Sequence, residues 1–463
     1  MEAVHPPAAP PIQFRDIQFR DIPEAGIDRA LSLAYLVFHE SPQDEKRKHH
    51  RDLLLDCVRI GAYDGEELVG FLAAFPFTVS VPGGEVPCPG LTFVSVAPTH
   101  RRRGVLSGMI AEMFAKASAD GAPIAALWAS EDAIYGRFGF GPATLGNTVE
   151  IDSRRPLALR ITPDDRPLRL LDPSDVPEVL GPYYDRTRTG RAGRLARTEA
   201  WWREEWMAEE DEDDDELSPP RVVTVENPTA LSRTTPEPPD APHAPHTPDA
   251  PHTPEAPHAP HAPHTPDTPT TPTPIAGYAI YRTKTRDDAP GLVRLDDLEA
   301  DTPAVAAALW RYLTAIDLTG TVRAWGRPLD DPLLLFAADR DQVRVTGQFP
   351  ALWVRLIDVR AALTARSWAA PVDAVLDVRD DRLPANAGRH RLTAAPGSCA
   401  YERTDDPADL TLDVRDLAAA YLGGTDIAAL VRAGLAQEHT PGTATALDAA
   451  LRTALLPHTV DEF

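Results

Sequence analysis

A basic turn between a strand and a helix carries the residue types that most directly suggest chemistry. In Phe93-Val-Ser-Val-Ala-Pro-Thr-His-Arg-Arg-Arg-Gly-Val-Leu106, a strand pattern ends at Val96, and Arg101–Gly104 leads into a helical pattern. The N-terminus of a helix offers unpaired N–H groups and partial positive charge, which together can bind a pyrophosphate. Gly104 allows a ligand to approach the backbone closely, and the arginines add charge. Judged by charge alone, a solvated surface cluster is the simpler interpretation of these arginines.

The elements around the turn predict an α/β unit that holds it in place. Strand patterns at Leu91–Val96 and Ile124–Trp128 enclose a helical pattern at Leu106–Ala119, and this order makes a βαβ unit. Upstream, a helix is expected at Ala25–Phe38, followed by a hairpin that turns at Asp64–Gly65. Downstream, the patterns predict helices at 300–316, Val359–Arg366, Leu417–Leu422 and Ile427–Ala433, and strands at Ala351–Asp358, Val372–Val378 and Leu410–Val414.

Length, charge and composition set the class of protein. The chain has 463 residues and a net charge of −24, from 70 acidic and 46 basic side chains. The length predicts roughly three domains of about 150 residues each. The acidity argues against nucleic-acid binding and against docking on anionic membranes. The N-terminus lacks a signal-peptide pattern, and no run reaches about 18 apolar residues, so a cytoplasmic protein is expected. The three cysteines lie far apart in sequence, and no disulfide framework is expected.

One tract has a composition unlike the rest. Residues 204–216 contain ten acidic side chains, and residues 217–274 contain 18 prolines and six of the 14 histidines, in a degenerate A-P-H/T-P-D repeat. Such a segment buries too little apolar surface to fold, so a disordered insertion is predicted at about 204–274. Strand patterns at Arg221–Val225 and Gly277–Arg282 place this insertion inside a domain. The histidines could chelate a metal, but repeat expansion is the simpler explanation, and no metal site is predicted.

Two segments resemble a known family. Residues 94–106, VSVAPTHRRRGVL, resemble the acetyl-CoA-binding motif of the GNAT acetyltransferases, in which an R/Q-x-x-G-x-G/A loop binds the CoA pyrophosphate. Arg101 and Gly104 fit that motif, whereas Leu106 replaces its final small residue. This departure, the unbroken HRRRG and the segment ALWASEDAIYGRFGFGP at 126–142 are similar to the enhanced-intracellular-survival (Eis) acetyltransferases of actinobacteria. The resemblance extends along most of the chain, because LWVRLIDVRAALTARSW at 352–368 resembles the start of that family's sterol-carrier-protein-like domain.

The resemblance implies the fold class and the division into domains. It implies an α/β (α+β) protein with tandem GNAT folds, the second degenerate, plus a sterol-carrier-protein-like C-terminal domain. The expected domains are 1–155 for the N-terminal GNAT acetyltransferase, 156–345 for the second GNAT fold with its insertion, and 346–463 for the C-terminal domain. The second region has no R-x-x-G loop, and its basic segment Arg186–Arg197 lacks the strand–glycine–helix order. A copy without cofactor is expected there, and the family implies a homohexamer.

The family's residues for acetyl-CoA carry over to matching positions. Backbone groups of Val94 and Val96 would bind the pantetheine arm in the way that an added strand binds. Arg101, Arg102 and Gly104 would bind the pyrophosphate, and Ser130 would lie beside the cofactor. The resemblance implies no metal.

The resemblance also implies two catalytic groups. Tyr135 would protonate the leaving CoA thiolate, because a phenol with a pKa of about 10 stays protonated at neutral pH and can still donate. Without the motif, Tyr135 would be a core aromatic beside Phe138 and Phe140. In the family the C-terminal carboxylate assists deprotonation of the attacking amine, a role that falls on Phe463, with Glu462 contacting the substrate. A frayed, solvated chain end is the alternative interpretation of these last residues.

The implied activity is acetyl transfer from acetyl-CoA to a primary amine. An acidic pocket suits polyamines such as aminoglycosides, or lysine side chains, since carboxylates attract ammonium groups. Phe93, Phe38 and Glu40 are the candidates for its wall, and the last two, from a weaker match in LVFHE at 36–40, could instead be core and surface residues. The alternative function is a non-catalytic carrier whose C-terminal domain binds a lipid and whose acetyltransferase site is vestigial. The intact cofactor residues favour the enzyme.

Overall fold

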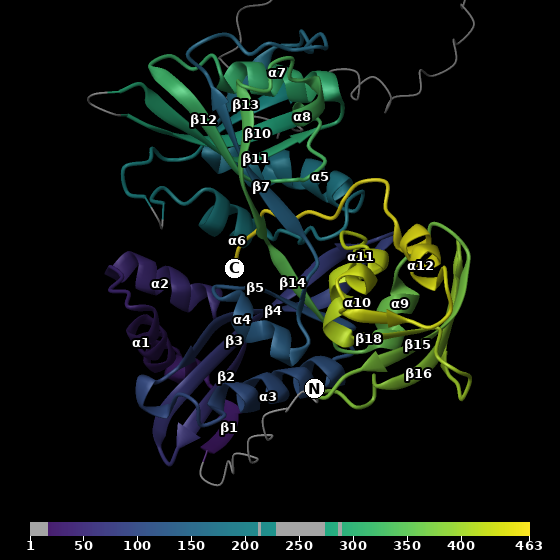
Figure 1. The fold of residues 1–463 in the computed structure, drawn as a ribbon. Coiled ribbons are helices and arrows are strands. Elements are labelled where there is room, and N and C mark those ends of the chain that lie inside the picture. Colours follow the sequence, from purple (N-terminus) through teal and green to yellow (C-terminus); the bar gives the residue numbers. More distant parts are fainter. Residues whose placement is uncertain (1–16, 212–213, 228–273, 286–288) are drawn as a thin grey trace, which may run out of the picture.

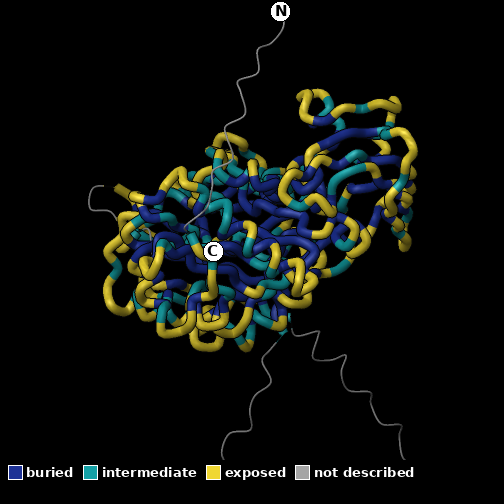
Figure 2. The backbone as a smooth tube through the Cα atoms, turned by 90° about the horizontal axis from the view of Figure 1, so that it is seen from below, coloured by how far each residue is buried: buried dark blue, intermediate teal, exposed yellow. Residues whose placement is uncertain are grey.

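Three β-sheets with helices packed against them make up the molecule (Figure 1). The computed structural model describes residues 17–211, 214–227, 274–285 and 289–463. Buried backbone lies in the interior of the molecule, and exposed backbone lies mostly at its periphery (Figure 2). The mixed α/β architecture agrees with the predicted fold class. Among the described residues, no helix is both long enough and apolar enough to cross a bilayer.

The first sheet carries the basic turn. Its order is β1 (Ile17–Asp21), β2 (Val58–Asp64), β3 (Glu67–Val81), β4 (Gly84–Val96), β5 (Ile124–Trp128), β14 (Leu352–Leu356) and β6 (Gly141–Pro142). Its helices are α1 (Ile27–Phe38), α2 (Asp44–Leu53), α3 (Val105–Ala119) and α4 (Asp132–Tyr135). The predicted βαβ unit is confirmed, because α3 connects β4 to β5 and these two strands are parallel. Helix α3 buries Val105, Met109 and Met113, spaced four residues apart, on the face that packs against the sheet.

The second sheet stands above the first in Figure 1. Its order is β13 (Val343–Pro350), β7 (Leu145–Asp152), β12 (Thr319–Arg327), β11 (Gly291–Ala300), β10 (Ile275–Lys284), β9 (Arg221–Glu226) and β8 (Leu168–Leu171). The accompanying helices are α5 (Val176–Arg188), α6 (Glu199–Trp201), the π-helix η5 (Trp202–Trp206), α7 (Pro303–Leu313) and α8 (Leu333–Phe336).

The third sheet forms the C-terminal part. Its order is β17 (Ser398–Arg403), β16 (Gly388–Ala395), β15 (Val372–Arg379), β18 (Leu410–Asp413) and β19 (Ala436–Glu438). The helices packed on it are α9 (Val359–Ala365), α10 (Val414–Tyr421), α11 (Ile427–Arg432) and α12 (Thr443–Leu451). Their apolar side chains join those of the strands in one core.

Two strands cross the boundaries expected from the sequence. β7 lies before residue 155, yet it pairs with β12 and β13 in the second sheet. β14 lies after residue 345, where the third domain was expected to begin, yet it pairs with β5 and β6 in the first sheet. The strand predicted at Ala351–Asp358 is therefore present but belongs to a different sheet. The sequence pattern of a strand indicates which of its side chains are buried, but it does not predict which neighbouring strand it pairs with.

The insertion begins later than predicted. β9 and β10 are antiparallel neighbours with Glu226 opposite Ile275, which confirms that the tract interrupts a strand pair inside one sheet. Residues 204–211 and 214–227 are ordered, contrary to the predicted start at 204, and residues 228–273 lie outside the described part. The acidic run is ordered because bases of β10 and β11 neutralise it: Asp211 pairs with Arg294, and Lys284 lies 2.7 Å from Asp214.

Candidate functional site

Strand β4 carries a bulge where it leaves β5. Phe71 of β3 pairs with Ser95, but Ala73 pairs with Thr92, so one extra residue is accommodated in β4. Phe93, at this place, has a left-handed φ of 50°, as a bulge requires. The parallel ladder between β4 and β5 contains only Gly90 with Ala126 and Leu91 with Leu127. Beyond Leu91 the two strands separate, and the predicted pantetheine residues, Val94 and Val96, lie on the separated part of β4.

The turn after β4 has the shape of an anion-binding loop. Arg102 and Gly104 have φ values of 62° and 81°, and α3 begins at the next residue, Val105. Among the described residues, neither Arg101 nor Arg102 makes an ion pair, whereas Arg103 lies 4.0 Å from Asp64. Two exposed guanidinium groups without a protein partner therefore adjoin the first turn of a 15-residue helix. A charged phosphate group suits that environment.

Tyr135 ends α4 and is 6% exposed. Its ring packs edge-on against Phe140, with 6.1 Å between the ring centroids, so the core-aromatic interpretation describes its ring. Its hydroxyl has no hydrogen-bond partner among the described residues, yet it is not one of their fully buried unpartnered oxygens, so it retains contact with solvent. Burial, and secondarily Glu131, raises the pKa of the Tyr135 phenol to about 12. The side chain is thus a neutral donor whose oxygen is not completely buried.

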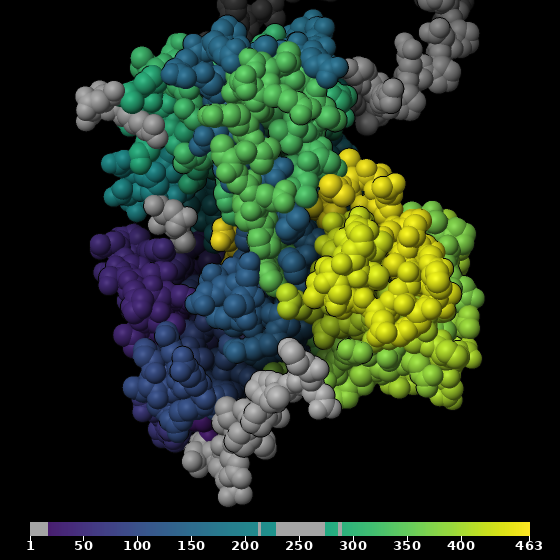
Figure 3. Space-filling view, viewed as in Figure 1, coloured from purple at the N-terminus to yellow at the C-terminus, as the bar shows by residue number. Residues whose placement is uncertain are grey.

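The chain end packs into the first domain and is not frayed. The Phe463 ring lies edge-on to Phe75 and Phe77, with centroids 6.4 Å and 4.9 Å away. A Cβ on Gly90 would lie 2.8 Å from the Phe463 ring, so glycine is needed where β4 passes it. Figure 1 draws the C-terminus between α6 and β5, and Figure 3 shows yellow atoms of the chain end inside a hollow between the first and second sheets. Glu462 is exposed.

Most of the predicted site residues lie around the hydrophobic core of the first sheet. Phe93, Val94, Val96, Tyr135 and Phe463 pack around one hydrophobic core. The Phe93 ring also lies edge-on to His50 of α2, at 5.3 Å. Ser130 is exposed just beyond β5.

Phe38 and Glu40 stand apart from that core. Phe38 is 41% exposed at the last residue of α1, and Glu40 is exposed shortly after it. Among the described residues, no hydrogen bond, ion pair or ring contact joins either side chain to Tyr135 or Phe463.

Residues that the sequence interpretation missed surround Asp461. Its carboxylate accepts hydrogen bonds from the side chains of Arg197, Trp201 and Trp206. Arg197 belongs to the basic segment that was expected to be only the remnant of a degenerate copy. The run EAWWREEW at 199–206 was a visible signal, because three tryptophans among three glutamates in one short run are unusual on a solvated loop.

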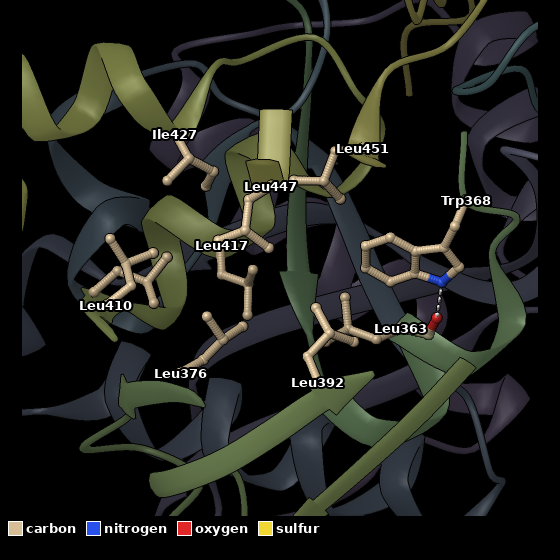
Figure 4. A pocket seen from close by; sticks show the side chains of 10 residues that line it. Leu363, Trp368, Leu376, Leu392, Leu410, Leu417, Ile427, Leu447 and Leu451 are labelled. Atoms are coloured by element: carbon tan, nitrogen blue, oxygen red, sulfur yellow. Dashed lines mark hydrogen bonds between the residues drawn. The ribbon is translucent and has the colours of Figure 1, made fainter. Parts of the chain in front are cut away.

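A small apolar cavity lies in the interior of the third domain (Figure 4). Ten apolar side chains, among them Leu376, Leu417 and Leu447, leave a space of about 10 Å³ for the centre of a water molecule. Trp368 closes one end and donates its indole N–H to the Leu363 carbonyl at 3.2 Å. A cavity of this size holds about one water. As it stands, this cavity is too small for a lipid.

The class of protein follows from the fold together with its similarity to known domains. Residues 18–143 and 269–360 each match a family described as an acetyltransferase (GNAT) domain, and residues 359–459 match a sterol carrier protein domain. The first match contains the bulged strand, the basic turn and most of the core beneath them. The molecule is an acyltransferase of the GNAT class with a second GNAT fold and a sterol-carrier-like domain.

Full-length relatives narrow the class further. The chain is 39% identical to an uncharacterized N-acetyltransferase of Streptomyces avermitilis over 411 residues, which is 87% of this chain and 89% of the relative. It is 31% identical to the N-acetyltransferase Eis of Mycobacterium tuberculosis over 414 residues, 88% of each chain. The crystal structure of Eis1 from Mycobacterium abscessus is similar with a TM-score of 0.76 at 29% identity, covering 96% of this chain and 100% of that one. The chain belongs to the Eis family of GNAT N-acetyltransferases.

Proposed function

We propose that the protein transfers the acetyl group of acetyl-CoA to a primary amine of a polyamine, such as an aminoglycoside, or to a lysine side chain. The observation that carries the proposal is the position of the chain end. The Phe463 ring packs on Gly90, the first of the two β4 residues that still pair with β5, beside the part where the strands separate. A terminal carboxylate at this residue is available to a reaction in that opening.

Acetyl-CoA is assigned to the groove of β4 and the turn that follows. The backbone of Val94 and Val96 binds the pantetheine arm, because separation from β5 leaves one side of β4 open to an added strand. The pyrophosphate binds to the α3 N-terminus at Gly104 and to the side chains of Arg101 and Arg102. Ser130, just after β5, adjoins the cofactor from the other strand.

The reaction is a direct attack of the neutral amine on the thioester. A C–N bond forms, the C–S bond breaks, and CoA leaves with its sulfur as the leaving atom. Tyr135 donates a proton to that sulfur, and the Phe463 carboxylate helps to remove a proton from the nitrogen, directly or through water. The products are an acetamide and the CoA thiol. No covalent enzyme intermediate is needed.

The acceptor lies on the acidic side of the opening. Exposed carboxylates of Glu40 and Glu462 attract ammonium groups, and Phe38 and Phe93 supply apolar wall. The small cavity of the third domain disfavours the lipid-carrier alternative. We assign the working enzyme to the cytoplasm as a homohexamer, for which light scattering should give six times the 50.3 kDa chain mass.

The test is acetyl-CoA turnover with a panel of amines. Thiol release should occur with polyamines and be absent with the same compounds after full acetylation. Two variants, Tyr135→Phe and a chain extended by two glycines after Phe463, should retain acetyl-CoA binding by calorimetry and lose most turnover. If both variants keep wild-type turnover, the assigned mechanism is wrong, and if wild type fails to bind acetyl-CoA, the assigned function is wrong.

A further inference from the structure

Asp461 is a buried carboxylate two residues before the chain end. It is 3% exposed. Arg197 donates to it from Nε at 2.8 Å and from Nη2 at 3.3 Å. Trp201 and Trp206 donate their indole N–H groups at 3.2 Å and 3.0 Å. The Tyr184 hydroxyl lies 3.3 Å from the same carboxylate and 2.9 Å from the Leu195 carbonyl, and its single proton is shared between them. All of these donors come from the second domain, which has no cofactor loop.

Arg197 is itself held rigidly. Its guanidinium lies over the Tyr184 and Trp206 rings, 4.0 Å and 3.9 Å from their centroids. It also donates to Asp297 at 3.0 Å, and Asp297 accepts a second bond from the Tyr278 hydroxyl at 2.8 Å. Burial lowers the pKa of Arg197, but its anionic neighbours outweigh burial and hold that pKa well above its ordinary value. The guanidinium therefore stays charged, and its position is determined by the second sheet.

The same contacts reach the rings on which Phe463 packs. Trp201, which binds Asp461, lies edge-on to Phe75 and Phe77 at 5.5 Å and 5.2 Å. The amide of Ala196 donates to the Thr78 carbonyl at 2.9 Å, so the segment before Arg197 runs along the end of β3. From the other side, Trp128 at the end of β5 donates its indole N–H to the Asp461 carbonyl at 2.6 Å.

We propose that Asp461 is a positioning residue that fixes the terminal carboxylate of Phe463 for catalysis, with the second GNAT domain as its rigid support. The inference rests on the proposed function, because it assigns Asp461 to the same reaction. Two residues of chain have several rotatable bonds, and a carboxylate that must act at one place loses effectiveness when it samples many. Four N–H donors, from Arg197, Trp201 and Trp206, hold the Asp461 carboxylate, and Trp128 holds its backbone carbonyl. These bonds remove that freedom at Asp461. The second domain thus has a role in the reaction without binding cofactor.

The first test is steady-state kinetics of Asp461→Asn. The predicted result is a fall in kcat of at least tenfold, with KM for acetyl-CoA within twofold of wild type. Combining Asp461→Asn with two glycines after Phe463 should cost no more than the worse single change, since both act through one carboxylate. A milder variant, Trp206→Phe, keeps the ring over Arg197, loses one donor, and should reduce kcat a few-fold.

The matched control is Asp380→Asn. Asp380 is also buried and lies just after β15 of the third sheet, where it pairs at 2.6 Å with Arg355 of β14, and among the described residues no hydrogen bond or ion pair joins it to Asp461. It should lower thermal stability and leave kcat unchanged. Equal losses of kcat in Asp380→Asn and Asp461→Asn would show that general destabilisation causes the loss, and would overturn the proposal. Wild-type kcat in both Trp206→Phe and Asp461→Asn would also overturn it.

A second measurement is independent of acetyl transfer. A carboxypeptidase that prefers aromatic C-terminal residues should release Phe463 slowly from the folded wild type and at least tenfold faster from Asp461→Asn, with Asp380→Asn resembling wild type. Equal release from wild type and Asp461→Asn would show that Asp461 does not hold the chain end. If release accelerates but no amine is acetylated by wild type, the anchor stands and the proposed function fails.

Discussion

At the scale of single residues, burial keeps Tyr135 neutral. A buried phenolate is poorly solvated, so the pKa of this phenol rises to about 12, and the proton stays on the oxygen at neutral pH. The same burial is what a core aromatic would show. The hydroxyl oxygen distinguishes a general acid from a core aromatic. A general acid needs the hydroxyl, whereas a core aromatic needs only the ring.

Tyr135→Phe removes that oxygen and keeps the ring. We predict that kcat falls by about 10²–10⁴-fold, the usual contribution of a general acid, while KM for acetyl-CoA changes little. The assay is thiol release at saturating amine. The control is Tyr401→Phe in the third domain, whose hydroxyl is buried without a partner and which should leave kcat unaltered. Comparable kcat in wild type and Tyr135→Phe would refute the role.

The pH dependence follows from the direction of the same shift. The folded pKa of Tyr135 is raised above the unfolded value of about 10, so its stabilising contribution is complete below about pH 10 and is lost as pH rises towards about 12. Between about pH 7 and pH 9.5 we therefore expect kcat to rise or level off as the amine deprotonates. A descending limb in that range that disappears in Tyr135→Phe would contradict the assigned state.

Arg102 should act on binding and not on chemistry. A hydrogen bond to a charged group contributes about 1.5–3 kcal/mol, so Arg102→Ala should raise KM for acetyl-CoA roughly tenfold or more with little change in kcat. The increase should grow smaller at high salt. Arg344→Ala, an exposed arginine on β13, is the control. If Arg102→Ala leaves KM for acetyl-CoA unchanged, the arginines of the basic turn are a solvated surface cluster and do not bind the cofactor.

At the scale of elements, α2 is attached to η5 through His49. Its Nδ1 lies 3.3 Å from Glu204, and its Nε2 lies 3.1 Å from Glu205. The hydrogen bond to Glu205 raises the pKa of His49, although burial opposes it. The contact therefore stabilises the fold fully below about pH 6.5, the unfolded pKa, and is lost as pH rises through the higher folded pKa.

His49→Gln should consequently destabilise the protein in a pH-dependent way. We expect a loss of about 1 kcal/mol near pH 6 that shrinks towards zero at pH 9, measured by denaturant unfolding. His39→Asn, an exposed change at the end of α1 where the backbone is left-handed, should show no such pH dependence. An effect of His49→Gln that is constant from pH 6 to pH 9 would show that the imidazolium is not responsible.

Local patterns predicted individual elements better than their partners. The helix expected at Leu106–Ala119 is α3, one residue longer, and the strands on either side are β4 and β5. Periodicity detects such elements because their burial is set by residues a few positions apart. The sequence could not predict that β7 belongs to the second sheet and β14 to the first, because the pattern of each strand fits a buried position in either sheet.

At the scale of the whole molecule, the insertion lies between two neighbouring strands of one sheet, β9 and β10. Because Glu226 pairs with Ile275, residues 229–272 can be replaced by about five glycines and serines without moving β9 from β10. Shortening the loop should stabilise the fold by up to about 2 kcal/mol, from the lower entropy of loop closure. Thermal unfolding and amine acetylation should show an equal or higher Tm and unchanged kcat. A large loss of kcat would assign the tract a part in the reaction.

Sequence motifs identified the candidate residues of the site but not the residues that support it. Gly104 and Tyr135 became candidates because the motifs that contain them are continuous in sequence. Asp461 was missed because its partner Arg197 lies 264 positions away, and only folding brings the two within 2.8 Å. The acidic run at 204–216 was expected to be disordered because composition does not reveal that Arg294 and Lys284 lie opposite it.

The most direct test of the central claim is to quantify acetylated amine and free CoA together, by mass spectrometry, in one reaction with a polyamine acceptor. Wild type should form the two products in equal amounts. Tyr135→Phe and the chain extended beyond Phe463 should form little of either, while still binding acetyl-CoA. CoA release without acetylated amine, or equal product from wild type and both variants, would contradict the account.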